Sequence, residues 1–224
     1  MKIIARIHTD FKEKFGIPRQ SGLAEARGRI VFEPEYRAPE ALRGLEGYSH
    51  LWIIWEFSEA KRENFSPTVR PPRLGGNTRV GVFATRSPYR PNPIGLSSVK
   101  LERIENTKNE GCVLHVLGAD MLDGTPIYDI KPYLPFTDCH ADAVGGFSDE
   151  VRDYALEVQI SGRLLDTVDE DKRATLIEVL RGDPRPSYKA DGESEYGMRF
   201  AEYEVKFAVS DGVLTVKNIL KIHK

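Results

Sequence analysis

Two arginines and three prolines crowd the stretch GVFATRSPYRPNPIGLS, which spans residues 81–97. Its first residues suit a buried strand, but each proline removes a backbone donor and fixes a φ angle, which a sheet tolerates badly. Arg86 and Arg90 stand among these prolines. Because a guanidinium binds a carboxylate or phosphate through two parallel hydrogen bonds, the stretch favours recognition of an anionic group by a rigid loop.

Charge is unevenly distributed along the chain, although the net charge is only −2. Residues 64–101 contain five arginines and one lysine but no acid, whereas residues 138–171 contain ten acids and two arginines. Such segregation fits an anionic ligand on the basic stretch, and equally an ordinary solvated surface. The excess of arginine over lysine favours phosphate or carboxylate recognition.

Three more stretches combine proline with polar side chains: FGIPRQSGL at 15–23, PTVRPPRLGGN at 67–77 and MLDGTPIYDIKPYLPF at 121–136. Each lies between expected strands or at a strand end. Rigid loops of this composition suit a preorganised site for a polar ligand, so we expect the four stretches to form one shared site.

Common catalytic signatures are absent from the sequence. It contains no glycine-rich phosphate loop, no dinucleotide fingerprint after a strand and no nucleophile elbow. The five histidines lack the spacing of metal ligands, and Cys139-His140 is the only suggestive pair. We therefore expect no metal site.

Short apolar stretches of strand length dominate the first 135 residues. We expect strands at 2–8, 29–33, 49–57, 79–85, 96–104, 112–118 and 125–130, and a short helix at 39–47. Many short strands with little helix predict a mainly β fold, a small barrel or curled sheet.

The pattern changes after about residue 137, where a polar linker precedes new elements. Thr167 and Glu170 form a capping-box pattern before an apolar helix face that ends at Gly182. Residues 203–209 alternate like a strand, and Asp211-Gly212 predicts a hairpin turn. We therefore expect a β-barrel domain over 1–140 and a small α+β domain over 141–224.

The composition, 40% hydrophobic and 29% charged residues, is typical of soluble globular proteins. The N-terminal residues lack the apolar region of a signal peptide, and no segment approaches the ~20 apolar residues that span a bilayer. Two cysteines are too few for a disulfide scaffold. These features predict a reduced, cytoplasmic protein without a membrane segment.

The strings IPRQSGL, RGLEGYSHLWIIWEF, PTVRPPRLGGN, GVFATRSPYRPNPIGLS and LDGTPIYDIKPYLPF resemble the TsaA-like (TrmO) family. The later GDPRPSY resembles a motif in the second domain of its bacterial members. The resemblance covers nearly the whole chain and implies a TsaA-like β-barrel. It also implies a homodimeric S-adenosylmethionine-dependent tRNA methyltransferase, with the cofactor near the subunit interface. The implied acceptor is the exocyclic amine of threonylcarbamoyl-adenosine at position 37, in the anticodon loop of threonine tRNA.

The resemblance further implies which residues contact the cofactor: Pro18, Arg19, Gln20, Ser58, Glu59, Arg86, Leu96, Asp123, Gly124, Thr125 and Pro126. Their chemistry agrees in part, because a methionine carboxylate suits the guanidinium of Arg86 or Arg19. The sulfonium and ammonium groups suit acceptors such as carbonyls beside Leu96 or the carboxylate of Asp123.

Methyl transfer is an in-line displacement, so the main contribution of an enzyme is alignment of the reactants. Removing or polarising the proton of the acceptor amine would also help. Asp129 is the candidate base or orienter, and a strand-end hydrogen bond is an equal alternative for it. Asn92 and Tyr133 are candidates for positioning the acceptor.

We expect tRNA binding to be mostly electrostatic and strongly salt-dependent. The candidate residues are Arg70, Arg73, Arg79, Arg90, Lys131 and Arg185. Tyr89 is available to stack on a splayed base. Arg185 and Tyr188 of the second domain either contact RNA, which we favour, or dock that domain onto the barrel.

Two other functions are compatible with parts of the sequence. A non-catalytic barrel that binds RNA or a nucleotide-like ligand would use the same arginine-rich loops. A hydrolase acting through Asp123 and Asp129 is a weaker alternative, since no nucleophile, metal constellation or acid–base pair accompanies them.

Overall fold

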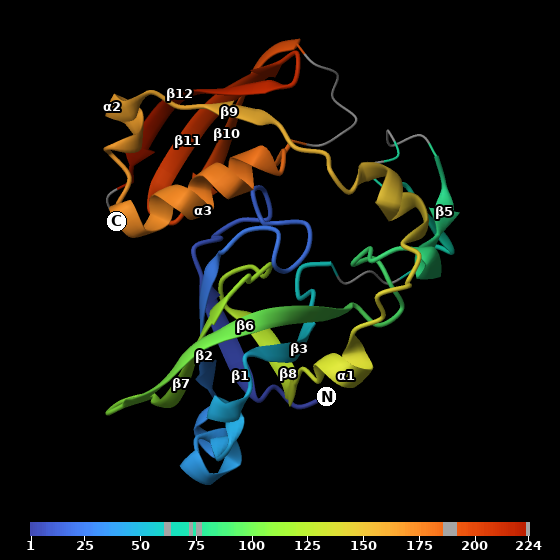
Figure 1. Cartoon of the computed structure of the whole chain (residues 1–224), viewed down its shortest axis with the longest axis vertical. Coiled ribbons are helices and arrows are strands. Elements are labelled where there is room, and N and C mark those ends of the chain that lie inside the picture. The colour runs from blue at the N-terminus through green and yellow to red at the C-terminus, as the bar shows by residue number, and fades with distance from the viewer. Residues whose placement is uncertain (61–63, 72–73, 75–77, 186–191, 223–224) are drawn as a thin grey trace.

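The structure, a computed structural model, describes residues 1–60, 64–71, 74, 78–185 and 192–222. Six antiparallel strands close into a barrel in the order β1-β2-β7-β6-β3-β8 (Figure 1). These strands are β1 Ala5–Thr9, β2 Arg27–Phe32, β3 His50–Glu56, β6 Ile94–Thr107, β7 Gly111–Leu117 and β8 Thr125–Pro132. The expected N-terminal β-barrel is confirmed.

Every second residue of the strands fills the barrel interior. In β3 the side chains of Leu51, Ile53 and Trp55 point inward, with at most 4% of their surface exposed. Burying an aliphatic side chain of this size contributes about 1.5–3 kcal/mol, so β3 is a strong anchor of the core. Trp52 and Ile54 alternate with these residues and are half-buried on the outer face of the barrel. The strand therefore supplies both core and an apolar outer surface.

The predicted strand at 79–85 is wrong. Only Val80–Gly81 (β5) pairs, with Thr68–Val69 (β4), and a 3-10 turn follows at Val82–Ala84. The segment belongs to a long excursion between β3 and β6. Because β3 and β6 pair directly with each other in the closed barrel, the segment cannot pair between them.

The predicted helix at 39–47 is also wrong. Two 3-10 turns, Pro39–Leu42 and Leu45–Gly47, occupy this segment, and Gly44 separates them at a φ of 88°. Helix nucleation is costly, so a stretch of this length interrupted by a left-handed glycine does not sustain an α-helix.

A four-stranded sheet in the order β10-β11-β12-β9 and the helix α3 form the second domain (Figure 1). Its elements are β9 Glu157–Gln159, α2 Gly162–Leu165, α3 Glu170–Arg181, β10 Gly192–Phe200, β11 Tyr203–Ser210 and β12 Val213–Lys221. The expected α+β character is confirmed.

The connection between β1 and β2 contributes to the core of the second domain rather than to that of the barrel. Phe11, Ala24 and Ala26 are buried in that core, and Phe15 and Ile17 pack against it. The segment 11–26 is therefore attached to the barrel by the chain at both ends but folded onto the second domain.

Helix α3 begins later than the capping-box pattern predicts. Its first residue is Glu170, and the preceding Asp169 makes no side-chain cap. Thr167 instead donates its hydroxyl to the carbonyl of Leu164, at the end of α2. The capping-box prediction is wrong because the hydroxyl of Thr167 bonds to α2 and does not cap α3.

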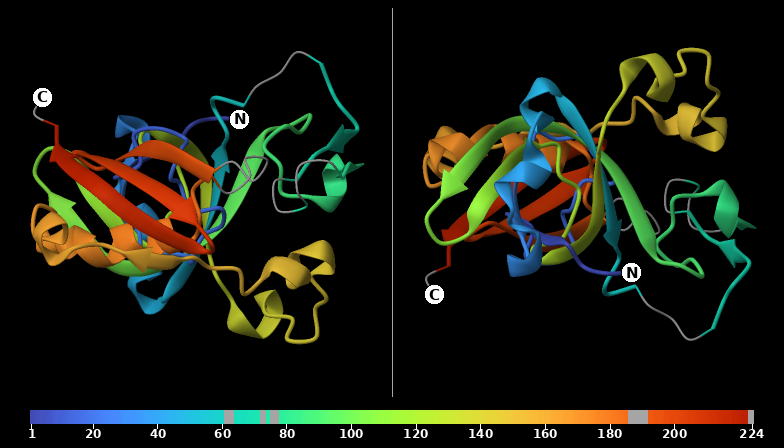
Figure 2. Two further views of the ribbon diagram at one scale, coloured as in Figure 1. Left: turned by 90° about the horizontal axis from the view of Figure 1, so that it is seen from above. Right: turned by 90° about the horizontal axis from the view of Figure 1, so that it is seen from below.

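Two excursions, the described part of residues 57–93 and residues 133–156, lie on the same side of the barrel and stay apart (Figure 2). The second contains the short helix α1, Pro135–Asp138, and a 3-10 helix at Gly146–Val151, where the sequence predicts only a polar linker. Within the described parts of the chain, no helix is long and apolar enough to cross a membrane.

Candidate functional site

Three loops leave the barrel at one end. The strand register shows that β1, β3 and β7 end where β2, β6 and β8 begin. The segments 10–26, 57–93 and 118–124 therefore emerge together. All residues that the resemblance assigns to the cofactor lie in these segments or at the adjoining strand ends.

Gln20 and Arg86 contact each other at this end of the barrel. Nη1 of Arg86 donates to Oε1 of Gln20 at 2.5 Å, and Nε2 of Gln20 donates to the backbone carbonyl of Arg19. Arg86 is exposed, so its planar fork is accessible to an anionic group from solution. Arg19 turns the other way, and its Nη2 donates to the carbonyls of Asp183 and Arg185 in the second domain.

A carboxylate that the sequence analysis missed, Asp120, lies beside this pair. Its Oδ1 accepts the hydroxyl of the fully buried Ser97 at 2.6 Å, and the Ser97 oxygen accepts the indole N–H of Trp55 at 2.9 Å. Burial raises the pKa of Asp120 to about 6, against the opposing effects of the Ser97 hydrogen bond and the positive charge of Arg86. The only sequence signal was its place just before the LDGTP string.

Asp123 is held by groups of the chain itself. Its Oδ1 accepts the backbone N–H of Thr9 at 3.1 Å and lies 3.3 Å from His8 Nδ1, while Oδ2 lies 2.7 Å from Lys12 Nζ. Partial burial alone would raise the pKa of Asp123, but the hydrogen bonds from Lys12 and Thr9 hold that pKa below its ordinary value. The charged carboxylate thus ties the loop before β8 to β1.

The remaining cofactor candidates surround the same end. Glu59, which follows Ser58, pairs with Lys14 at 3.1 Å. Gly124 donates its N–H to the carbonyl of Ile7, and the next two residues, Thr125 and Pro126, are buried at the start of β8. Pro18 is half-buried beside Arg19.

Leu96, Ile54 and Asp129 form one row across the outer face of the barrel. Ile54 of β3 pairs with Leu96 of β6 on one side and with Asp129 of β8 on the other. Directly paired residues of antiparallel strands have their Cβ atoms about 4.5–5.5 Å apart, so Leu96 and Asp129 flank Ile54 closely. Leu96 is 57% exposed. The β3–β8 ladder is irregular at Tyr128, next to this row, and bulges of this kind re-aim side chains near active sites.

The structure does not bring Asp129, Tyr133 and Asn92 together: Tyr133 bonds through its N–H to the carbonyl of His50 at the start of β3, whereas Asn92 precedes β6 at the other end of the barrel. Asp129 Oδ1 accepts the N–H of Ile130, and its Oδ2 lies 3.0 Å from Lys131 Nζ. The ring of Tyr133 packs against Trp52, with centroids 5.5 Å apart. Asn92 is exposed in the proline-rich turn just before β6.

The residues proposed to bind tRNA occupy different environments. Arg70 and Lys131 are exposed, and Arg79 is an exposed side chain that donates to the hydroxyl of Thr68. Arg90 donates to the carbonyls of Val82 and Thr85, so it also holds the loop together. Arg73 and Tyr188 lie outside the described residues.

Arg185 is buried, with 7% of its surface exposed, and is paired with Asp183. This position disfavours the RNA contact that we expected for it. It favours the alternative role, in which Arg185 helps to dock the second domain.

Two surface hollows lie at other places on the barrel than Arg86. One is lined by residues including Pro39, Arg43 and Ile104 at the opposite end of the barrel. The other is lined by residues of β1, β2, β6 and β7, including His8, Arg29 and His115, and His8 also lies beside Asp123. Among the residues that the structure describes, no group of three or more His, Cys, Asp or Glu side chains is arranged to hold a metal ion.

Comparison with known proteins identifies two family matches. The model of the tRNA-methyltransferase O N-terminal domain matches residues 6–139, and that of the TrmO C-terminal domain matches residues 152–222.

Individual relatives agree with these matches. A protein of Escherichia coli (strain K12), named tRNA (adenine(37)-N6)-methyltransferase, is 41% identical over 217 residues, which cover 93% of this chain and 92% of that one. A Pyrococcus abyssi protein with the name "Probable S-adenosyl-L-methionine-binding protein" is 40% identical over 133 residues, 59% of this chain and 66% of that one. A crystal structure of TrmO from Pseudomonas aeruginosa superposes with a TM-score of 0.75 at 35% identity and covers 97% of both chains.

Proposed function

The chain belongs to the tRNA-methyltransferase O family, and on that premise we propose that it uses S-adenosylmethionine to methylate threonylcarbamoyl-adenosine 37 of threonine tRNA. Family membership makes it a tRNA methyltransferase. The cofactor, the modified nucleoside and the identity of the tRNA are the proposed parts. The single observation that carries the proposal is the contact between Arg86 and Gln20 beside Asp120, whose hydrogen-bond partner Ser97 follows Leu96 in β6.

The donor set at this end of the barrel fits S-adenosylmethionine. The exposed fork of Arg86 suits its carboxylate, and the oxygens of Gln20 and Asp120 suit its ammonium group. The exposed side chain of Leu96 offers apolar surface to the adenine or the methylene groups. Bound there, S-adenosylmethionine supplies a methyl group already activated by a sulfonium.

Asp129 is the proposed proton acceptor. Its carboxylate takes the proton that the exocyclic nitrogen loses as that nitrogen bonds to the methyl carbon and the bond from methyl to sulfur breaks. Asn92 and Tyr133 position the acceptor nucleoside, and alignment of the two reactants supplies most of the rate enhancement. Support for this role comes from the position of Asp129 in the row with Leu96.

Basic residues of the barrel and of the excursion 57–93 are the proposed contacts to the phosphates of the anticodon stem and loop. Arg70, Arg79, Arg90 and Lys131 remain the candidates with described positions, and Arg73 joins them from the sequence alone. Neutralising phosphates releases counterions, so binding weakens steeply with salt. The tRNA substrate also makes the cytoplasm the expected place of action.

We propose that two copies of the chain complete the site. Leu96, Phe83 and Phe136 expose 57%, 72% and 83% of their surfaces, so each offers apolar surface that a second copy would bury. Sedimentation equilibrium should give twice the monomer mass, and replacing Leu96 by Glu should lower it. A monomer with full activity would contradict the dimer.

The decisive experiment is mass spectrometry of unmethylated threonine tRNA after incubation with the protein and methyl-labelled S-adenosylmethionine. We expect one labelled methyl group on the threonylcarbamoyl-adenosine nucleoside. A tRNA that carries adenosine 37 without the threonylcarbamoyl group is the control. Methylation of that control at the same rate would contradict the proposed substrate. Absence of any cofactor binding in calorimetry would instead favour a non-catalytic binding module.

A further inference from the structure

Asp183 and Arg185 form a buried ion pair in the second domain. Their exposed fractions are 6% and 7%, and Nε and Nη2 of Arg185 donate to Oδ1 and Oδ2 of Asp183 at 2.9 and 3.2 Å. The hydroxyl of Tyr154 also donates to Asp183, at 2.7 Å. Removing one partner of such a pair leaves an uncompensated buried charge, so the pair is costly to break. We name residues 183–185 the clasp.

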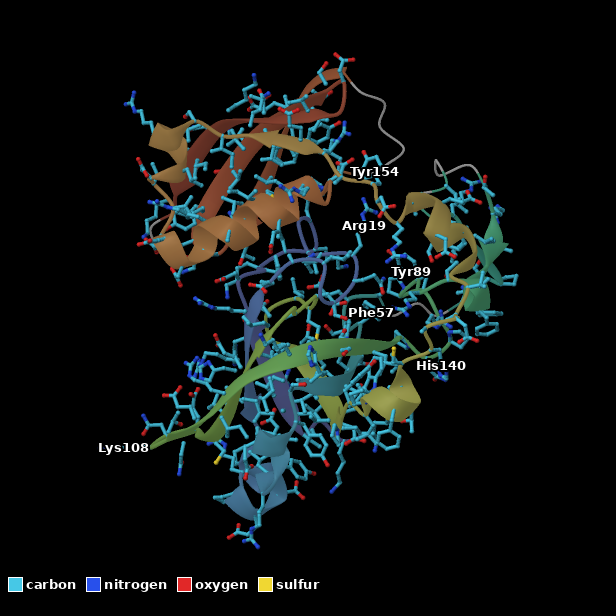
Figure 3. All side chains as sticks on the ribbon, viewed as in Figure 1. Arg19, Phe57, Tyr89, Lys108, His140 and Tyr154 are labelled. Carbon is cyan, nitrogen blue, oxygen red and sulfur yellow. The ribbon has the colours of Figure 1, made fainter. Side chains whose placement is uncertain are left out.

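The clasp presents backbone carbonyls toward the barrel. Asp183 has a φ of 53°, a left-handed conformation that aspartate tolerates better than most residues. Nη2 of Arg19 donates to the carbonyl of Asp183 at 3.1 Å and to that of Arg185 at 3.3 Å. Figure 3 shows Arg19 and Tyr154 at the junction between the barrel and the second domain. The guanidinium of Arg19 thus connects two parts of the chain that are 164 residues apart.

A chain of hydrogen bonds continues from Arg19 to the proposed cofactor site. The carbonyl of Arg19 accepts Nε2 of Gln20, and Oε1 of Gln20 accepts Nη1 of Arg86. The amide of Gln20 is therefore oriented on one side by Arg19 and on the other by Arg86.

The segment that carries Gln20 is held between the two domains. Phe15 and Ile17 pack against the core of the second domain. On the barrel side, the hydroxyl oxygen of Ser21 accepts the N–H of Ser98, and the N–H of Gly22 bonds to the carbonyl of Gly118. The conformation of this segment consequently depends on the second domain as much as on the barrel.

We propose that the clasp is a positioning device for the cofactor site, holding Arg19 and through it Gln20 and Arg86. This proposal rests on the proposed function, because it takes Gln20 and Arg86 as cofactor contacts. The clasp residues position the site and do not touch the reactants. The role of the second domain in catalysis is then to order the loop 18–20, not to add a phosphate contact through Arg185.

The test compares Asp183→Asn and Arg185→Met with Glu195→Gln, which removes a partner of an exposed ion pair with Lys206 on the same domain. We expect the two clasp variants to raise the KM for S-adenosylmethionine by about tenfold or more, because small misplacements of binding groups are costly. The KM for tRNA should stay within about twofold, and Arg185→Lys should restore part of the affinity. Assays run well below the melting temperature of each variant. A raised KM for tRNA with an unchanged cofactor KM would overturn the proposal in favour of an RNA contact.

A double-mutant cycle separates indirect from direct action. If the clasp acts through Arg19, the effects of Arg19→Met and Asp183→Asn on cofactor affinity should be strongly non-additive. Additive effects would show that Arg19 and the clasp act independently, and would contradict the proposal.

Hydrogen exchange without cofactor gives a readout that does not depend on the proposed function. Amides of residues 15–23 should exchange faster in Asp183→Asn than in the unaltered protein, while those of β3 stay unchanged. Unaltered exchange in 15–23 would overturn the positioning role. Failure of the unaltered protein to bind S-adenosylmethionine would instead refute the proposed function. The hydrogen-exchange result would still test whether the clasp orders residues 15–23.

Discussion

Nη1 of Arg86 donates a hydrogen bond of 2.5 Å to Oε1 of Gln20, a residue 66 positions earlier in the chain. The two side chains come from different loops at the same end of the barrel. Their contact places a guanidinium and an amide oxygen side by side, an arrangement suited to the carboxylate and ammonium groups of an amino-acid ligand.

Replacing Arg86 by alanine should abolish binding of S-adenosylmethionine while the fold persists, because the fork that binds its carboxylate is lost. Calorimetry measures the affinity, and circular dichroism checks the fold. Arg43→Ala is a matched control, since Arg43 is exposed at the opposite end of the barrel. Unchanged cofactor affinity in Arg86→Ala would remove this residue from the site.

Replacing Asp129 by asparagine should lower kcat by about 10²-fold or more and leave cofactor affinity unchanged, because the amide cannot accept the proton. Single-turnover methylation assays measure the rate. Asp142→Asn is the control, since Asp142 is an exposed acid outside the row of Leu96, Ile54 and Asp129. If Asp129 only supports the strand end, the variant will melt earlier but keep its kcat.

Asp120 should make the protein less stable as the pH rises. Burial raises its folded-state pKa to about 6, so between roughly pH 4 and 6 the folded chain binds more protons than the unfolded chain. The free energy of unfolding then falls through this window, by ~3 kcal/mol at about 1.4 kcal/mol per pKa unit. Asp120→Asn removes this dependence, so urea unfolding should show the variant gaining stability relative to the unaltered protein from pH 4 to 7. Parallel pH profiles of the two proteins would contradict the assignment.

Gly95→Ala should destabilise the barrel by at least about 1–3 kcal/mol. A Cβ at Gly95 would overlap the indole ring of Trp55, which packs across it inside the barrel. The midpoint of urea unfolding measures the effect. Gly81→Ala, where a Cβ meets nothing within 4 Å, is the matched control and should be nearly neutral. Equal midpoints for both variants would show that the core adapts to the added methyl group.

Replacing Arg70 or Arg79 by alanine should weaken tRNA binding and reduce the salt dependence of the binding constant. Each lost phosphate contact lowers the magnitude of the slope of log K against log salt concentration by about 0.7–0.9. Filter binding at several salt concentrations measures the slope. The Arg43→Ala variant is the control and should keep the slope of the unaltered protein. An unchanged slope in Arg70→Ala would show that Arg70 does not contact the phosphates.

Much of the fold and part of the site follow from local features of the sequence. Short apolar stretches of strand length, such as residues 49–57, predict the barrel strands, and in the structure burial falls on every second side chain of that stretch: Leu51, Ile53 and Trp55. The proline-rich loops predict where the proposed site lies. This can be inferred from sequence because proline restricts the backbone at its own position and arginine brings its own positive charge. The segments 39–47 and 79–85 misled the prediction because their apolar residues serve turns rather than regular elements.

Only the tertiary structure decided which of these residues meet. The contacts of Arg86 with Gln20 and of Arg19 with residues 183–185 depend on the register of the barrel and on how the two domains pack. Burial beside Ser97 raises the pKa of Asp120. Arg185 is buried because it pairs with Asp183. Sequence alone determined the types of group available, because composition and periodicity are local properties. Their pairing, burial and protonation are properties of the packed chain, since each depends on partners that are distant along it.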